Sequence, residues 1–242
     1  MAVEALAGAF GTGPGEEAPV EMKYAGLEGR RVAVVASLDP ALARRNPDLG
    51  PALAALLADR FARHVPGARV LPPEEVAAWQ RTHPWWESVP AGRVTAGLGV
   101  ERLVRVEVST WRTTQGGNAN VLEGQLDTAV QVYEDDAAAP PGGQGVGDPD
   151  RPVFLERVSV RFPEDSEMGL PTLGDSGDPG PEGIATPGGP DRAGVGRQLL
   201  ATWIRRAGPL FYDQEEAEER DRERAQQRAA LDAAAGPEAG PA

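Results

Sequence analysis

Ser37 and Asp39 follow the first apolar run of the sequence and could join His64 in nucleophilic chemistry. The carboxyl ends of strands in α/β proteins often carry functional groups. The same position also supplies Ser and Asp for turn formation, and no Gly-x-Ser-x-Gly surrounds Ser37. His64 lies near the end of a predicted helix, where a capping or surface role suits it equally well. We expect no catalytic residues and keep a site near these three residues as the alternative.

Acidic and glycine-rich segments are the candidates for metal and phosphate binding. Asp175, Asp178 and Glu182 have the residue types of a calcium loop but lack its one-three-five spacing and its closing Glu. The glycines between residues 142 and 147 have no strand before them, no helix after them and no Lys-Ser or Lys-Thr. The chain has no cysteine, which excludes thiolate sites and disulfides. We therefore expect no metal and no cofactor.

Two adjacent tryptophans, Trp85 and Trp86, follow His83 and Pro84 in a chain with only 5% aromatic residues. They fall in a connector that should run over the surface, where two neighbouring indoles cannot easily both point inward. One interpretation is that they seal a small hydrophobic cluster. The other is that one of them, Trp86 in preference, is presented to a partner, because Trp is enriched among residues that carry binding energy. Both are therefore partner-binding candidates.

The net charge of −13 is concentrated in three segments. Segments 134–151, 164–192 and 214–242 together carry −14, which leaves +1 for the remaining residues. This acidity favours the solubility of those segments rather than an acidic binding face. No block of Lys and Arg could neutralise phosphates, so we expect no nucleic acid partner. No apolar run reaches about 18 residues, so we expect no transmembrane segment.

Segments 100–111 and 121–134 have the strongest pattern, a period of two that a helix cannot satisfy. The residues expected on the apolar face are Val104, Val106, Val108, Thr110, Leu122, Leu126, Val130 and Val132. Those expected on the charged face are Arg105, Glu107, Ser109, Glu123, Gln125, Asp127 and Gln131. The connector between the segments contains Gly and Asn, which tolerate positive φ, and it predicts an antiparallel hairpin. The apolar face then needs a layer of helices.

The rest of the chain supplies these helices and further strands. Strands are predicted at 32–37, 69–71 and 153–162, and helices at 49–64, 73–82 and from residue 195 onward, with a further helical turn or two at 90–98. If segment 153–162 pairs with segment 121–134, its exposed arginines are expected opposite Glu123 and Asp127. Segment 32–37 is apolar on both faces, which is typical of a strand inside a sheet. The fold class is therefore α/β (α+β), a single mixed sheet of about five strands with about three helices packed on it. The expected order is strand, helix, strand, helix, three strands, helix.

Composition predicts how the chain is divided. We expect a flexible lead at 1–22, a single α/β domain at 23–213 with mobile acidic loops at 134–151 and 164–192, and a charged helical or disordered tail at 214–242. The tail has oppositely charged pairs at the i, i+4 spacing, such as Glu216 with Arg220. It has no apolar stripe with which to dock, so we expect it to contribute little to stability.

Residues 6–9 (LAGA) have the small-residue character that follows a signal peptide and would match a bacterial lipobox if Ala9 were Cys. A charged start and an apolar core should precede such a site, but only five residues, including Glu4, do so here. We expect no signal peptide in this chain. The match is either chance in an Ala-rich terminus or the trace of a start that lies upstream.

Five short stretches match one group of proteins: 24–35 (YAGLEGRRVAVV), 73–76 (PEEV), 79–80 (WQ), 83–84 (HP) and 210–213 (LFYD). Together they resemble an uncharacterised family of exported planctomycete proteins, commonly lipoproteins. More remotely, the layout is similar to the small α/β domain of the curli-secretion lipoprotein and to the amino-terminal domain of the Tol-Pal propeller protein. The resemblance covers about residues 22–213 and brings no catalytic residues. The chain departs from it by lacking a lipid-anchor Cys and by its longer acidic loops.

The resemblance implies a periplasmic or envelope-associated location, with the cytoplasm as the alternative. The expected function is a non-enzymatic binding or assembly module of unknown ligand, whose partner is another envelope protein. The alternative is a small hydrolase or transferase with a site near Ser37, Asp39 and His64. An enzyme of that kind needs Ser37 and His64 within hydrogen-bond reach beside a concave pocket. The sequence does not specify the oligomeric state.

Overall fold

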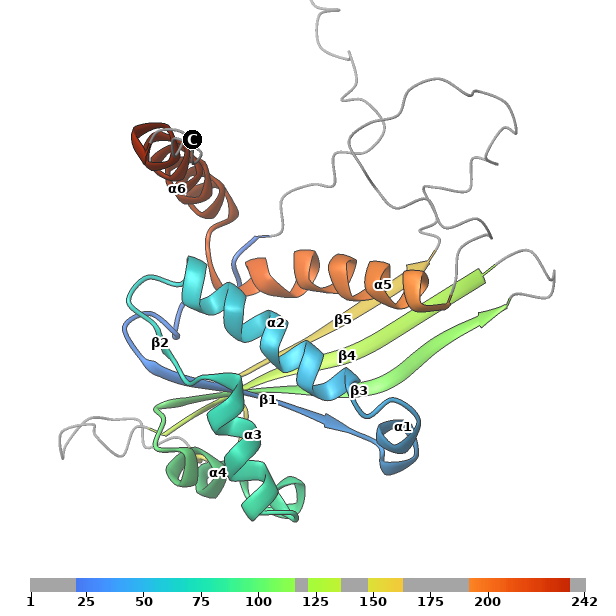
Figure 1. Ribbon diagram of the computed structural model, residues 1–242. Helices are drawn as coiled ribbons and strands as arrows, with labels where there is room; N and C mark the ends of the chain where they lie inside the picture. Colours follow the sequence, from blue (N-terminus) through green and yellow to red (C-terminus); the bar gives the residue numbers. More distant parts are fainter. Residues whose placement is uncertain (1–20, 116–121, 136–147, 163–191, 236–242) are drawn as a thin grey trace, which may run out of the picture.

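Five strands form one mixed sheet in the computed structural model, which describes residues 21–115, 122–135, 148–162 and 192–235 (Figure 1). The strands are β1 (Arg31–Leu38), β2 (Arg69–Val70), β3 (Arg102–Gln115), β4 (Leu122–Glu134) and β5 (Phe154–Phe162). Their spatial order is β2-β1-β3-β4-β5. β1 pairs in parallel with β2 and β3, whereas β4 is antiparallel to both β3 and β5. The predicted hairpin, the mixed sheet and the α/β fold class are confirmed.

Six α-helices, rather than about three, occur in the described part of the chain. They are α1 (Pro40–Arg45), α2 (Leu49–His64), α3 (Pro73–Thr82), α4 (Ala91–Leu98), α5 (Arg192–Ala207) and α6 (Gln214–Ala235). Two short 3-10 helices, η1 (Trp86–Ser88) and η3 (Gly208–Phe211), join them. The bounds of α2 and α3 agree with the prediction. α1 has six residues, too few for a helical period to stand out in the sequence, whereas α4 falls on the helical turn or two predicted at 90–98.

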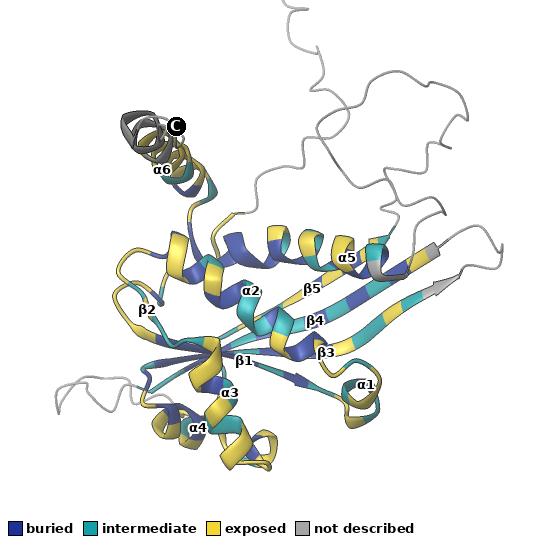
Figure 2. Ribbon diagram, viewed as in Figure 1, coloured by how far each residue is buried: buried dark blue, intermediate teal, exposed yellow. Residues whose placement is uncertain are grey.

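α2 and α5 cover the apolar face of the sheet, where the buried residues concentrate (Figure 2). Buried residues of the sheet in this core include Val34, Val104, Val106, Leu126, Val130 and Val160, and those of the helices include Leu53, Leu57, Phe61, Leu199 and Trp203. One polar residue, Thr128, lies among them and is fully hydrogen-bonded. Trp203 Nε1 donates to Thr128 Oγ1 at 2.9 Å, and Thr128 Oγ1 donates to the carbonyl of Val158 at 3.2 Å. This chain of bonds fixes α5 against β4 and β5.

The opposite face is covered in part, which corrects the prediction of one apolar and one charged face. A second hydrophobic cluster there joins residues of the sheet to α3, η1 and α4. Its members are Ala33, Val35, Val76, Trp86, Ala91, Val94, Leu98, Val100, Leu103 and Tyr133. β1 is apolar on both faces and therefore requires helices on both, as parallel strands do. The remainder of this face, on β3, β4 and β5, is polar.

A β-bulge in β3 corrects the predicted position of Thr110. The pairing of β3 with β4 shifts register between Val108 and Thr110, leaving Ser109 as the extra residue. Thr110 therefore lies opposite Asp127 on the polar face, and Trp111 lies opposite Leu126 on the apolar face. A one-residue shift exchanges the two faces of a strand, and this is why strict alternation misplaced Thr110.

The tail helix α6 docks on the end of α2, which corrects the expectation that nothing would hold it. Ala217 in its first turn is buried. The guanidinium of Arg220 donates to the carbonyl of His64 at 2.8 Å, and that of Arg224 donates to the carbonyl of Arg63 at 3.1 Å. The last carbonyls of a helix lack partners within it and carry partial negative charge, so arginines satisfy them well. The docking therefore combines hydrogen bonds from two arginines with the burial of Ala217 in the hydrophobic core, and it involves no apolar stripe along the helix.

Residues 1–20 of the predicted lead, and residues 136–147 and 163–191 of the two predicted loops, lie outside the described part of the chain. The end of the first loop is described and contacts α4, since the amide of Gly92 donates to Asp150 Oδ1 at 2.9 Å. No helix of the described ranges is long and apolar enough to cross a membrane.

Candidate functional site

The structure does not bring Ser37, Asp39 and His64 together. Ser37 lies near the carboxyl end of β1, beside the start of α2, where Gly50 packs against Leu38. His64 is the last residue of α2, which has 16 residues and is therefore about 24 Å long. The carboxylate of Asp39 caps α1 by accepting from the amide of Ala41 at 2.8 Å, the turn-forming role. The hydrolase or transferase constellation is not formed.

The candidate metal and phosphate segments, with Asp175, Asp178, Glu182 and the glycines between 142 and 147, lie outside the described residues. Within the described ranges, no group of three or more Asp, Glu or His side chains could hold a metal ion. The remaining candidates are single side chains in environments unusual for their type, such as a buried histidine or an exposed tryptophan.

His64 is such a residue, because its imidazole can carry a charge although its side chain is only 1% exposed. Nε2 lies 3.4 Å from a guanidinium nitrogen of Arg60 and 3.7 Å from Asp221 Oδ2 on α6. Nδ1 has no hydrogen-bond partner among the described residues, and the ring lies 4.9 Å from that of Tyr212. Burial lowers the pKa of His64, the charge of Asp221 opposes this, and Arg60 adds to it. The neutral imidazole is therefore the form that this packing favours.

Stability should decrease as the pH falls because of His64. The unfolded chain protonates this residue near pH 6.5, whereas the folded protein, with its lowered pKa, resists protonation until a lower pH. The contribution is thus complete above pH 6.5 and is lost below it, at up to about 1.4 kcal/mol per pH unit, until the folded pKa is reached. Urea unfolding between pH 7.5 and 5.5 measures this slope. His64→Phe should flatten it and His83→Phe, at the exposed second histidine, should not; equal slopes in wild type and His64→Phe would refute the assignment.

Residues 83–89, here the Trp85 loop, join α3 to α4 and are held by a series of backbone hydrogen bonds. The amide of Trp86 donates to the carbonyl of His83, that of Ser88 to Trp85, and that of Val89 to Trp86, at 2.9, 2.9 and 3.1 Å. The ring of His83 stacks on Trp79 of α3 with centroids 4.3 Å apart. The loop is therefore a turn held by its own backbone hydrogen bonds and by the stacking of His83 on Trp79.

Trp86 anchors the Trp85 loop to the sheet. Its side chain is 9% exposed and belongs to the second hydrophobic cluster. The guanidinium of Arg105 on β3 lies 5.6 Å from its ring centroid, a cation–π distance, and also donates to the carbonyl of Glu87 at 3.2 Å. Loss of solvent raises the pKa of the Glu87 carboxyl, whereas Arg105 and the backbone of Leu38 at the end of β1 oppose the shift. These contacts hold the loop at the carboxyl end of β1.

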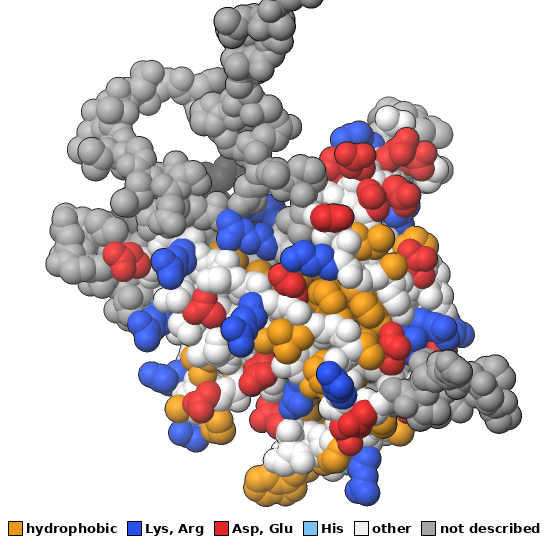
Figure 3. Space-filling model, turned by 180° about the vertical axis from the view of Figure 1, so that it is seen from behind, with side chains coloured by type: hydrophobic (Ala, Val, Ile, Leu, Met, Phe, Trp, Pro, Cys, Tyr) orange, Lys and Arg blue, Asp and Glu red, His pale blue; other side chains and the backbone are white. Residues whose placement is uncertain are grey.

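Trp85 has the opposite environment, with 79% of its side chain exposed. The prediction that Trp86 is the presented indole is therefore wrong, and Trp85 takes that position. In the view from behind, charged side chains of both signs are spread over the molecule and hydrophobic side chains reach its lower edge (Figure 3). The other exposed large hydrophobic residues in the described ranges are Met22, Val153 and Leu155, with 38%, 51% and 51% exposure. Trp85 is thus the most exposed large hydrophobic side chain of the described structure.

No protein-family model matches the chain, and no curated protein sequence does. Among solved structures, a lipoprotein of Neisseria meningitidis is similar, with 11% identity over 54% of this chain and 81% of that one, at a TM-score of 0.39. The PelC dodecamer of Paraburkholderia phytofirmans is similar with 13% identity over 77% of this chain and 90% of that one, at 0.37. A hypothetical protein of Chlamydia trachomatis has 14% identity over 54% and 71%, at 0.31. With such TM-scores, these neighbours identify no ligand or site here, and the planctomycete resemblance stays a prediction.

Proposed function

We propose that this chain is a non-enzymatic binding module that recognises a protein partner through Trp85. The observation that carries the proposal is that the indole of Trp85 is 79% exposed on a turn held by backbone hydrogen bonds before and after it. Neighbouring Trp86 is buried in the second hydrophobic cluster and contacts the guanidinium of Arg105. Trp85 is therefore exposed on a loop that is anchored to the sheet. An exposed aromatic side chain on a rigid scaffold is a typical binding anchor.

The expected energy is large enough to matter for recognition. Covering an indole removes about 150–250 Å² from water, which contributes about 4–6 kcal/mol before ordering costs. Because the Trp85 loop is already ordered, its own ordering cost on binding is small. A partner that offers a pocket for one indole would therefore gain affinity mainly from this side chain.

Selection from a displayed peptide library tests the proposal with no need to identify the natural partner first. Clones selected on the wild-type protein should bind Trp85→Ala at least tenfold more weakly, because hot-spot truncations cost about 2 kcal/mol or more. Met22→Ala removes another exposed hydrophobic side chain and should leave binding unchanged. The proposal fails if the selected clones bind wild type and Trp85→Ala equally well.

The cell envelope is the proposed location, and another envelope protein the proposed partner. This part is supported by the sequence resemblance to exported proteins. Fractionation of cells that produce the protein from its native gene, including any upstream in-frame start, would test it. Recovery in the cytosolic fraction alone would refute the envelope location and leave the Trp85 proposal standing.

A further inference from the structure

β5 is the edge strand of the sheet, and its outer side has no partner strand among the described residues. The carbonyl of Val158 accepts from the hydroxyl of Thr128, its partner in β4, so the backbone groups of Val158 face inward, toward β4. Backbone groups alternate along an antiparallel strand, and those of Arg157, Ser159 and Arg161 therefore face outward. Arg206 of α5 donates to the carbonyl of Ser159 at 3.0 Å, so this carbonyl faces away from β4, and an added strand would share it with Arg206 or displace that side chain. An edge of this kind can pair with another strand.

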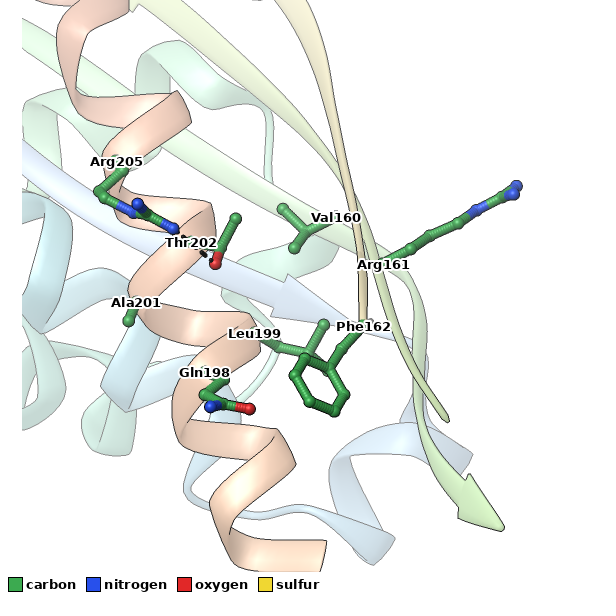
Figure 4. A pocket seen from close by; sticks show the side chains of 8 residues that line it. All are labelled: Val160, Arg161, Phe162, Gln198, Leu199, Ala201, Thr202 and Arg205. Carbon is green, nitrogen blue, oxygen red and sulfur yellow. Dashed lines mark hydrogen bonds between the residues drawn. The ribbon is translucent and has the colours of Figure 1, made fainter. Parts of the chain in front are cut away.

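A groove of about 190 Å³ runs between this edge and α5 (Figure 4). Its lining residues are Val160, Arg161, Phe162, Gln198, Leu199, Ala201, Thr202 and Arg205. On α5, the residues at 198, 201, 202 and 205 recur at three- and four-residue spacing and therefore share one side of the helix. Ala201 and Thr202 in the middle of this stripe are small. They leave room above the edge of β5 for the side chains of one added strand.

The polar side of the edge carries positive charge. Arg157 and Arg161 are exposed on the face away from α5, and Figure 4 shows Arg161 extending away from the helix. Neither guanidinium has a hydrogen bond or an ion pair within the described structure. Of the carboxylates nearby, Glu156 pairs with Lys23 at 2.9 Å and Asp127 accepts from Ser159 and Gln125.

We propose that the outer edge of β5 binds an extended acidic segment of a partner protein as a sixth, antiparallel strand. Acidic side chains at positions i and i+4 of that segment would lie directly opposite Arg161 and Arg157, where cross-strand pairs interact. The residues between them would alternate to the α5 side and enter the groove as apolar side chains. This surface is separate from Trp85, so the inference stands or falls independently of the proposed function.

A second copy of the same edge is a poor occupant because it would bring arginines to arginines. Centred on Ser159, two antiparallel copies of β5 would set Arg157 of each chain directly opposite Arg161 of the other. Like charges at this spacing oppose pairing, and charged edges commonly prevent such self-association. An acidic strand, in contrast, would complement the charges of the same arginines.

A fluorescein-labelled peptide, Gly-Glu-Val-Ser-Val-Glu-Gly, tests the proposal with the full-length protein at low salt. We expect fluorescence anisotropy to show saturable binding that weakens at least tenfold in the double variant Arg157→Glu, Arg161→Glu. The peptide with Lys in place of both Glu residues should bind the double variant better than the wild type. Because both positions are exposed, the variants should fold normally, and circular dichroism checks this.

Backbone pairing is tested by N-methylation of the peptide. Methyl groups on the Glu and Ser amides, which would face β5, should abolish binding, whereas methyl groups on the two Val amides should not. Equal binding of both methylated peptides would show charge attraction without strand addition and overturn the proposal. Absence of binding by the parent peptide, or equal binding by wild type and double variant, would overturn it as well.

Discussion

Val130→Asp should leave the protein without a cooperative unfolding transition. Val130 lies in the middle of β4 with no exposed surface and is packed in the core beneath the helices. An aspartate there places a carboxylate among apolar side chains with no partner, which costs several kcal/mol in addition to the lost packing. That sum approaches the whole stability of an ordinary domain, about 5–15 kcal/mol. Val106→Asp should behave in the same way, because Val106 is equally buried in β3.

Ala129→Asp is the matched control, one residue away on the opposite face. Ala129 is partly exposed and lies between Glu107 of β3 and Arg157 of β5, so the added carboxylate remains hydrated, and its repulsion from Glu107 is offset by its attraction to Arg157. We expect its stability to stay within about 1 kcal/mol of the wild type. Urea unfolding followed by circular dichroism measures all three variants. Cooperative unfolding of Val130→Asp, with loss of structure in Ala129→Asp, would mean that the two faces of the sheet are reversed.

Trp86→Ala should destabilise the protein by about 3 kcal/mol, whereas Trp85→Ala should change stability by less than about 0.5 kcal/mol. The two indoles are adjacent in sequence, yet one belongs to the second hydrophobic cluster under Arg105 and the other is 79% exposed. Replacing the buried one leaves a cavity between the Trp85 loop and the sheet. Replacing the exposed one removes few contacts.

Circular dichroism in urea is the suitable measurement, because the substitutions change the tryptophan fluorescence itself. Acrylamide quenching adds a second readout, since Trp85→Phe should remove the most accessible component of the emission and Trp86→Phe should not. Heavy destabilisation by both substitutions, with no accessible emission in the wild type, would mean that the loop is only a lid on the core.

Long periodic segments of this sequence predicted their structures well. The faces of β4 and the length of α2 follow from apolar residues repeated at two and at three and four, respectively. Predictions failed where one residue alters the period or where an element is short. The bulge at Ser109 moved Thr110 to the polar face, and α1 has only six residues.

The surface position of the Trp85 loop was predictable from the sequence, but the orientation of its two indoles was not. Proline before two tryptophans indicated a surface turn, but which indole points outward depends on Arg105, which is distant in sequence and reaches the loop from β3. The docking of α6 was missed for a similar reason. Its contacts are arginines bonded to the carbonyls of His64 and Arg63, and a hydrophobic pattern does not reveal such contacts.

The cross-strand partners of the arginines of β5 were also not predictable from the sequence pattern. The sequence suggested that they would lie opposite Glu123 and Asp127, but Arg161 lies opposite Gln125, Ser159 opposite Asp127 and Arg157 opposite Ala129. Alternation specifies the face of a residue, whereas its partner depends on the register between strands. This register leaves the arginines without ion pairs in the described structure, and it is the basis of the inference about the edge.

Fluorine NMR of the protein labelled with 5-fluorotryptophan tests the central claim, recognition through Trp85, most directly. The chain has five tryptophans, so five signals are expected, and single Trp→Phe substitutions assign them. When a peptide from the library selection is added to the wild-type protein, the Trp85 signal should shift or broaden most, while the signal of buried Trp203 should stay in place. An unchanged Trp85 signal at saturating peptide would contradict the claim that this indole contacts the ligand.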